Sequence, residues 1–141
     1  MGLDFETFPS LEAQIASVSD DIAYMNHDLD DGFRAGLFNP KDLNKLSFYK
    51  EIIKEYGIEE LSDRFKKELV RKLINKMVVD LIKQIETNLN KIKPKNVNDI
   101  RNAGFNIASF SNKMKKVDMQ IKDFLSYNMY NHKKVIINTN K

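Results

Sequence analysis

The chain has 141 residues, which is enough for one domain with a hydrophobic core and too few for two domains of ordinary size. It contains no cysteine, so a disulfide-stabilised fold, a thiolate zinc site and a cysteine nucleophile are excluded. With 42% hydrophobic and 30% charged residues the composition is globular, and no apolar run reaches the roughly 18 residues that cross a bilayer. The N-terminus lacks the features of a secretory signal, so we expect a single cytoplasmic domain, residues 1–141, without membrane contact.

Charge is unevenly distributed along the chain. Residues 1–38 carry eight acidic side chains and one basic side chain, a net charge of −7, whereas residues 39–141 carry +10. A basic body of this kind would suit an anionic ligand or nucleic acid. Because its lysines are spread along the chain and form no block, we favour solvated helix faces over nucleic-acid binding.

The low content of glycine and proline favours helices, and the first helix is predicted over about residues 11–28. Its apolar residues recur at steps of three and four and form one stripe: Leu11, Ile15, Val18, Ile22, Met25 and Leu29. Ser10 is the predicted N-cap and Gly32 the predicted end. A further helix is expected to open at Asn39-Pro40, and that element or its successor should end at Gly57.

The longest periodic segment is predicted over residues 62–92, with an apolar seam from Phe65 to Ile92. It would form the spine of the domain, and a coiled coil is the alternative interpretation. A short turn of helix is predicted over residues 99–103. Ser111 should cap a last helix that reaches about His132, followed by a weakly structured tail. The pattern predicts an all-α fold with one long spine helix.

The polar face of the first helix carries the candidate site. On a helical wheel at about 100° per residue, Asp20 lies opposite the apolar stripe. Four side chains of chemical interest surround it: Tyr24, His27, Asp28 and Asp31. The same side also carries small residues: Ala13, Ala16, Ser17 and Ala23. Small residues combined with Asp, Tyr and His suit a second packed surface with a polar pocket, in which carboxylates and a tyrosine would hold a metal ion or sugar hydroxyls. An exposed acidic helix end is the alternative.

Together these segments resemble a known protein family. The resembling segments are SLEAQIA at 10–16, DDIAY at 20–24, HD at 27–28, DDG at 30–32, DIRNAG at 99–104, FS at 110–111, FL at 124–125, MYNH at 129–132 and Val135. They resemble the deoxyguanosinetriphosphate triphosphohydrolase-like proteins of the HD superfamily. The resemblance extends over nearly the whole chain, from about Ser10 to Val135.

The resemblance implies an all-helical, metal-dependent hydrolase. Such an enzyme converts a deoxynucleoside triphosphate, dGTP by the family name, to deoxynucleoside and tripolyphosphate. A His, a consecutive His-Asp pair and a later Asp hold its divalent metal, Mg²⁺, Mn²⁺ or similar. By resemblance Asp20 is the later metal-ligand Asp, and Tyr24 and Asp28 bind the sugar. Asp21 and His27 are expected in supporting positions around the site.

The chain departs from the family pattern where the other ligands should be. Its two histidines, His27 and His132, match neither the first His nor the His-Asp pair of the family, because His27-Asp28 lies after the ligand Asp. The sequence resembles a central-to-C-terminal fragment of the enzyme. Alone it is expected to be inactive, to bind no metal tightly and to form homo-oligomers, with an upstream complementing chain as a further partner. A non-catalytic helical interaction module is the alternative function.

Overall fold

The computed structural model describes residues 8–56 and 63–139, and every regular element in these ranges is a helix. The elements in chain order are α1 (Leu11–Arg34), the 3₁₀ helix η1 (Pro40–Lys45), α2 (Ser47–Tyr56), α3 (Asp63–Ile92), α4 (Val97–Arg101) and α5 (Asn112–Thr139). The predicted all-α fold with one long helix is therefore confirmed for the described residues. Within those residues, no helix combines the length and the apolar character needed to span a membrane.

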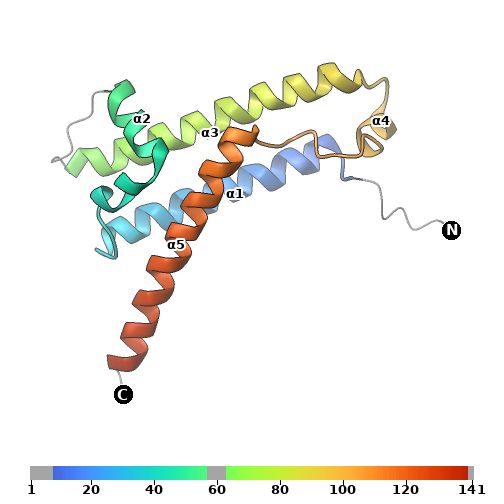
Figure 1. Ribbon diagram of the computed structural model, residues 1–141. Coiled ribbons are helices and arrows are strands. Elements are labelled where there is room, and N and C mark those ends of the chain that lie inside the picture. The colour runs from blue at the N-terminus through green and yellow to red at the C-terminus, as the bar shows by residue number, and fades with distance from the viewer. Residues whose placement is uncertain (1–7, 57–62, 140–141) are drawn as a thin grey trace.

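Helices α1 and α3 run antiparallel, and α5 crosses them, as Figure 1 shows. The apolar stripes of these helices meet in the core, where nine large side chains are almost completely buried: Leu29, Leu43, Ile52, Phe65, Leu69, Leu73, Met77, Ile107 and Ile121. η1 and α2 lie at the end of the bundle where α1 finishes, and α4 lies at the opposite end (Figure 1). The spine predicted from the periodicity of residues 62–92 is α3; Ser62 and Gly57 lie outside the described residues.

Helix starts follow the local capping chemistry that the sequence predicts. Ser10 Oγ accepts a hydrogen bond from the backbone N–H of Ala13 at 3.2 Å, and Ser111 Oγ accepts one from that of Met114 at 3.2 Å. The backbone N–H of Asn39 donates to Asp42 at 2.7 Å, at the start of η1. Each contact satisfies a backbone group that lacks a partner at a helix end.

The predicted end of the first helix at Gly32 is wrong, because α1 continues through this residue to Arg34. Gly32 is buried, and a side-chain carbon there would overlap the ring of Phe38. The glycine therefore allows close packing inside the helix, and the left-handed residue after the helix is Gly36, with φ of +70°.

The last two helices also differ from their predicted limits. The short helix α4 begins and ends two residues earlier than expected, with Asn96 as its N-cap. α5 does not stop near His132 but continues to Thr139, so the predicted weakly structured tail is wrong as far as that residue. Extending an existing helix fixes one residue for each new hydrogen bond, which outweighs the modest helix propensity of the β-branched residues there.

The irregular segment 102–111, which connects α4 to α5, is held by side chains from α1 and α3. Gln14 is buried, and its Oε1 accepts a hydrogen bond from the backbone N–H of Ala108 at 3.0 Å. Asn88 is also buried and donates to the carbonyl of Ile107 at 2.9 Å. Asp80 accepts from the backbone N–H of Ser111 at 2.8 Å and from its hydroxyl at 2.6 Å. These bonds fix where α5 begins and hence how it crosses α1.

Candidate functional site

A hollow of about 310 Å³ lies between α1 and α5 and contains two of the predicted site residues, Tyr24 and Asp28. The lining comes from two helices: Asp21, Tyr24, Met25 and Asp28 from α1, and Lys122, Leu125, Ser126 and Met129 from α5. Met25 and Leu125 are buried and form an apolar base, while Tyr24 is 71% exposed. The hollow thus offers an apolar surface, an aromatic ring and carboxylates side by side.

Lys122 brings a positive charge from α5 to this hollow. Its ammonium group donates a hydrogen bond to Asp21 Oδ2 at 2.7 Å and forms an ion pair with Asp118 Oδ2 at 3.1 Å. The hydrogen bond to Asp21 raises the pKa of Lys122, an effect that partial burial opposes and Asp118 reinforces. Lys122 is therefore a cation throughout the physiological pH range, and it joins α5 to α1 at the edge of the hollow.

The structure separates the predicted cluster into two groups. Asp21, Tyr24 and Asp28 lie together on the side of α1 that faces α5. Asp20 and His27 are exposed and do not line this hollow. On the helical wheel Asp20 and His27 are only about 20° apart, so both lie on the solvent side of the hollow.

The His, Asp and Glu side chains of the described residues do not make up a complete metal site. Among the described residues, no three His, Cys, Asp or Glu side chains lie close enough together to hold an ion. Asp20 offers one exposed carboxylate, whereas catalytic metal sites are built on several protein ligands. The side chain of His132 lies outside the described residues.

The small-residue face of α1 is the surface for which the sequence indicates a packing partner. Ala13, Ala16, Ser17 and Ala23 are all exposed, and Ile15 beside them is 37% exposed. The described parts of α3 and α5 pack against other sides of α1. No residue that the structure describes therefore covers the face next to Asp20.

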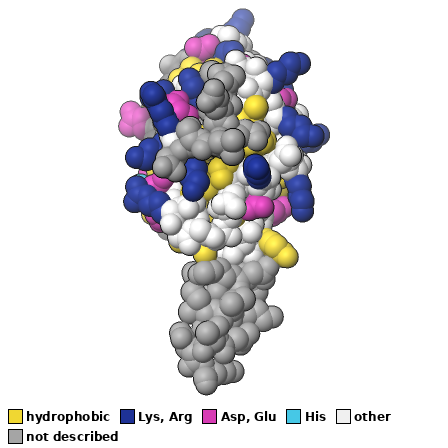
Figure 2. All heavy atoms as spheres, turned by 90° about the vertical axis from the view of Figure 1, so that its left-hand side faces the viewer, with side chains coloured by type: hydrophobic (Ala, Val, Ile, Leu, Met, Phe, Trp, Pro, Cys, Tyr) yellow, Lys and Arg dark blue, Asp and Glu magenta, His cyan; other side chains and the backbone are white. Residues whose placement is uncertain are grey.

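Basic residues are not gathered on the face of the molecule that Figure 2 presents. Lysine and arginine side chains are scattered there among aspartate and glutamate (Figure 2). Several are paired with acids, as in the contacts of Arg34 with Asp30 and of Arg71 with Glu68. On that side, basic and acidic side chains are therefore interspersed.

Sequence reasoning missed Lys122 and the three side chains that hold segment 102–111. Lys122 lies four residues after Asp118, and that spacing indicates only a helix ion pair. Its contact with Asp21 spans 101 residues in sequence and depends on how α5 crosses α1. Gln14 lies inside the resembling segment 10–16, yet nothing local indicates that it binds a backbone amide 94 residues away.

Three curated relatives of this chain have the same name. The chain is 39% identical over 139 residues to a protein of Rhizobium meliloti (strain 1021) named deoxyguanosinetriphosphate triphosphohydrolase-like protein. The matched segment covers 95% of this chain and 34% of that protein. Proteins of the same name from Pelagibacter ubique (strain HTCC1062) and Rickettsia rickettsii (strain Iowa) are 41% and 38% identical, over 98% and 94% of this chain and 38% and 35% of their own lengths. No family model matches the chain.

The chain spans about a third of the length of the curated relatives that it matches. The matched segments cover 94% to 98% of this chain and therefore include α1. By sequence, the chain is therefore a relative of the deoxyguanosinetriphosphate triphosphohydrolase-like proteins over about one third of their length.

Proposed function

We propose that this chain forms one wall of the active site of a deoxynucleoside triphosphate triphosphohydrolase. The remainder of the site would come from protein corresponding to the other two thirds of its relatives. The observation that carries the proposal is the hollow between α1 and α5, where Tyr24 and Asp28 lie together above an apolar base. Their presence on one wall supports a role in binding a group with both an apolar face and hydroxyls, such as a deoxyribose.

The proposed contacts follow from the chemistry of these side chains. The ring of Tyr24 is large, rigid and mostly exposed, so one of its faces is free to pack against a sugar. The ionised carboxylate of Asp28 accepts hydrogen bonds only, which suits a hydroxyl donor such as the sugar 3′-OH. Met25 and Leu125 would exclude water beneath the sugar. The products would be deoxynucleoside and tripolyphosphate, with dGTP as the substrate that the relatives' name suggests.

Asp20 has a different part in this proposal. It would contribute one carboxylate to a divalent cation, Mg²⁺ or Mn²⁺, and the remaining ligands would come from outside the described residues. The exposure of Asp20 on the open face of α1 is consistent with a site completed by another protein segment. His27 is exposed beside it and would lie at the edge of the same interface.

A chimera tests this function in a complete protein. The matched segment of the Rhizobium meliloti relative is replaced by residues 1–141 of this chain, and tripolyphosphate release from dGTP is measured with Mn²⁺ against the unmodified relative. We expect activity in the chimera, a fall of about 10²-fold or more with Asp20→Asn, and a raised KM with Asp28→Asn. Glu86→Gln, which removes an exposed carboxylate on α3, is the matched control and should change neither value. A chimera that is fully active with Asn at position 20 contradicts the assignment.

The second candidate function is a non-catalytic interaction module, and the open face of α1 favours it. Contiguous exposed small and apolar residues allow two helices to approach closely. The two candidates differ in one variant of the chimera. Tyr24→Ala should lower nucleotide affinity if the hollow binds substrate, and should leave it unchanged if α1 serves association alone.

A further inference from the structure

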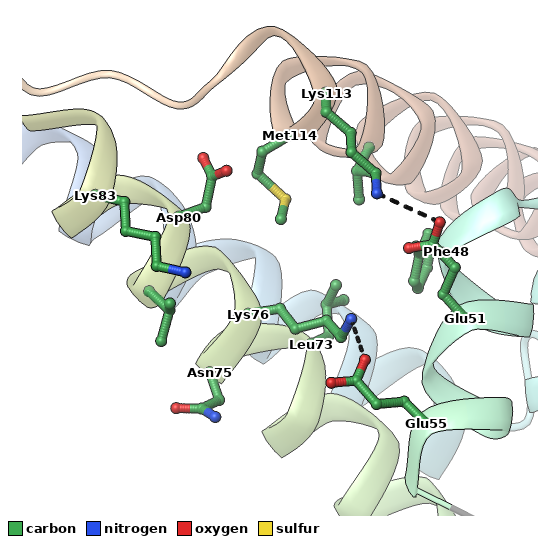
Figure 3. A pocket seen from close by; sticks show the side chains of 12 residues that line it. Phe48, Glu51, Glu55, Leu73, Asn75, Lys76, Asp80, Lys83, Lys113 and Met114 are labelled. Atoms are coloured by element: carbon green, nitrogen blue, oxygen red, sulfur yellow. Dashed lines mark ion pairs between the residues drawn. The ribbon is translucent and has the colours of Figure 1, made fainter. Parts of the chain in front are cut away.

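A second cleft, separate from the hollow between α1 and α5, opens between α2, α3 and the first turns of α5 (Figure 3). Its volume is about 400 Å³, which is within the range of small-molecule sites. The base is apolar, because Phe48, Leu73 and Val117 are buried and Met114 is partly buried beside them. No residue is common to this cleft and the hollow.

Charged side chains surround this apolar base, and most of them are paired. Lys76 contacts Glu55 at 2.6 Å, and Lys113 contacts Glu51 at 3.5 Å across the gap between α5 and α2 (Figure 3). The third acid of the lining, Asp80, is held by Ser111 through the two short hydrogen bonds described above. Each of the three carboxylates therefore already has a partner: a lysine for Glu55 and for Glu51, and the N–H and O–H groups of Ser111 for Asp80.

Lys83 is the exception in this cleft. It lines the cleft from α3 and is exposed, and its ammonium group makes no hydrogen bond or ion pair with the part of the chain that the structure describes. Figure 3 shows its ammonium group extended along the α3 side of the cleft. Lys113 is 78% exposed and its contact with Glu51 is long, so this pair contributes little and is easily exchanged for another anion.

We propose that this cleft binds a small organic anion, with its apolar body on Met114 and Val79 above the buried Phe48 and Leu73, and its phosphate or carboxylate group between Lys83 and Lys113. Met114 and Val79 still have exposed apolar surface, and covering that surface releases water and supplies affinity for the body of the ligand. The two ammonium groups select a negative charge and fix its position. The proposal is independent of the proposed function, since it uses none of the residues assigned to the nucleotide.

Phenyl phosphate is the probe that combines both chemical features. With the full 141-residue chain, the methyl resonance of Met114 is followed by NMR during titration with phenyl phosphate, inorganic phosphate or phenol. We expect saturable shifts with phenyl phosphate at a Kd of about 1 mM. Inorganic phosphate and phenol, which each have one of the two chemical features, should bind at least about fivefold more weakly. Equal affinity for inorganic phosphate and phenyl phosphate would overturn the proposal, as would the absence of saturable shifts.

Two matched variants locate the anion. Lys83→Gln should weaken phenyl phosphate binding about fivefold, because one charge-assisted contact is lost. Lys67→Gln removes an exposed lysine from the side of α3 that faces α1 and should leave the affinity unchanged. Equal loss in both variants would overturn the proposal, since it would mean unspecific attraction of the anion. Circular dichroism confirms that each variant is folded.

Discussion

Lys122 lines the candidate site and also joins the two helices that form it. It lies on α5, yet its shortest contact is the 2.7 Å hydrogen bond to Asp21 of α1, at the edge of the hollow that contains Tyr24 and Asp28. Because Asp118 contacts the same ammonium group, the lysine is held by carboxylates from both helices. Its side chain remains 45% exposed, so the pair is worth little energy and serves mainly to position the two helices.

Replacing Lys122 with Met should lower the free energy of unfolding by about 0.5–1 kcal/mol at pH 7. The pKa of Lys122 is raised in the folded chain, so its stabilising effect is complete below the ordinary pKa of 10.5 and is lost as pH rises through the folded value. The difference between wild type and Lys122→Met should therefore be constant from about pH 6 to 9 and shrink above about pH 10.5. Urea unfolding at each pH measures this difference in the free energy of unfolding. Lys116→Met, on the exposed side of α5, is the control, and an equal loss there would contradict the positional role.

Gly32 shows how one residue sets the packing of α1, the turn after it and α5. The ring of Phe38 lies against this glycine and packs edge-on against Phe33 and Phe124, with centroid distances of 5.1 and 4.9 Å. α1, the turn after it and α5 therefore meet at a position where only a hydrogen atom fits.

Gly32→Ala should destabilise the chain by about 1–3 kcal/mol, although alanine is normally the better helix former. The added methyl would push the Phe38 ring out of its place between two other rings. Thermal or urea unfolding gives the value, and Ser17→Ala on the exposed face of the same helix should stay within about 0.5 kcal/mol of wild type. A Gly32→Ala variant as stable as the control would mean that the ring moves at no cost.

At the scale of elements, local capping chemistry predicted three helix starts, whereas the ends of α1 and α5 were mispredicted. Ser10, Asn39 and Ser111 were recognisable as helix starts because capping involves residues three positions apart. The end of α1 was mispredicted because Gly32 has its partner in Phe38, beyond the helix. α5 was predicted too short because residues 133–139 lack an apolar stripe, and helix propagation does not need one.

Asn88→Ala should release segment 102–111 from α3. The buried carbonyl of Ile107 would lose its donor, at a cost of about 1–3 kcal/mol. Hydrogen exchange should become faster at the backbone amides of this segment, with the amide of Ala108 as the clearest reporter because Gln14 protects it. Asn90→Ala, which truncates an exposed residue of the same type on α3, is the matched control. Unchanged exchange in Asn88→Ala would contradict the role of this side chain.

At the scale of the whole molecule, the sequence named the residues of a candidate site, whose roles stay a prediction, and could not give their orientation. The wheel placed Asp20, Tyr24 and Asp28 on one broad face of the first helix, and the resemblance assigned their roles. The structure adds that Tyr24 and Asp28 line the hollow between α1 and α5, whereas Asp20 does not. Which flank of α1 meets α5 depends on the crossing of the helices and on the bonds to segment 102–111, which no local pattern encodes.

The open face of α1 predicts self-association of the isolated chain. Ala13, Ala16 and Ala23 are exposed and small, so a second copy can approach α1 closely. Light scattering at rising concentration should give a molar mass above that of one chain. Ala16→Arg, which places a bulky charge on this face, should shift the mass toward the monomer, whereas Asn90→Arg on α3 should not. A wild-type monomer at the highest concentration would contradict this expectation.

Tripolyphosphate release by the chain alone and by the completed assembly tests the central claim most directly. The 141-residue chain is incubated with dGTP and Mn²⁺, alone or together with a form of the Rhizobium meliloti relative that lacks the matched segment. Because Asp20 is the only metal ligand assigned to this chain, we predict no release by either part alone, release by the mixture, and its loss when the chain carries Asp20→Asn. Robust release by the chain alone, abolished by Asp20→Asn, would contradict the account, because one third of the protein would then contain a complete active site.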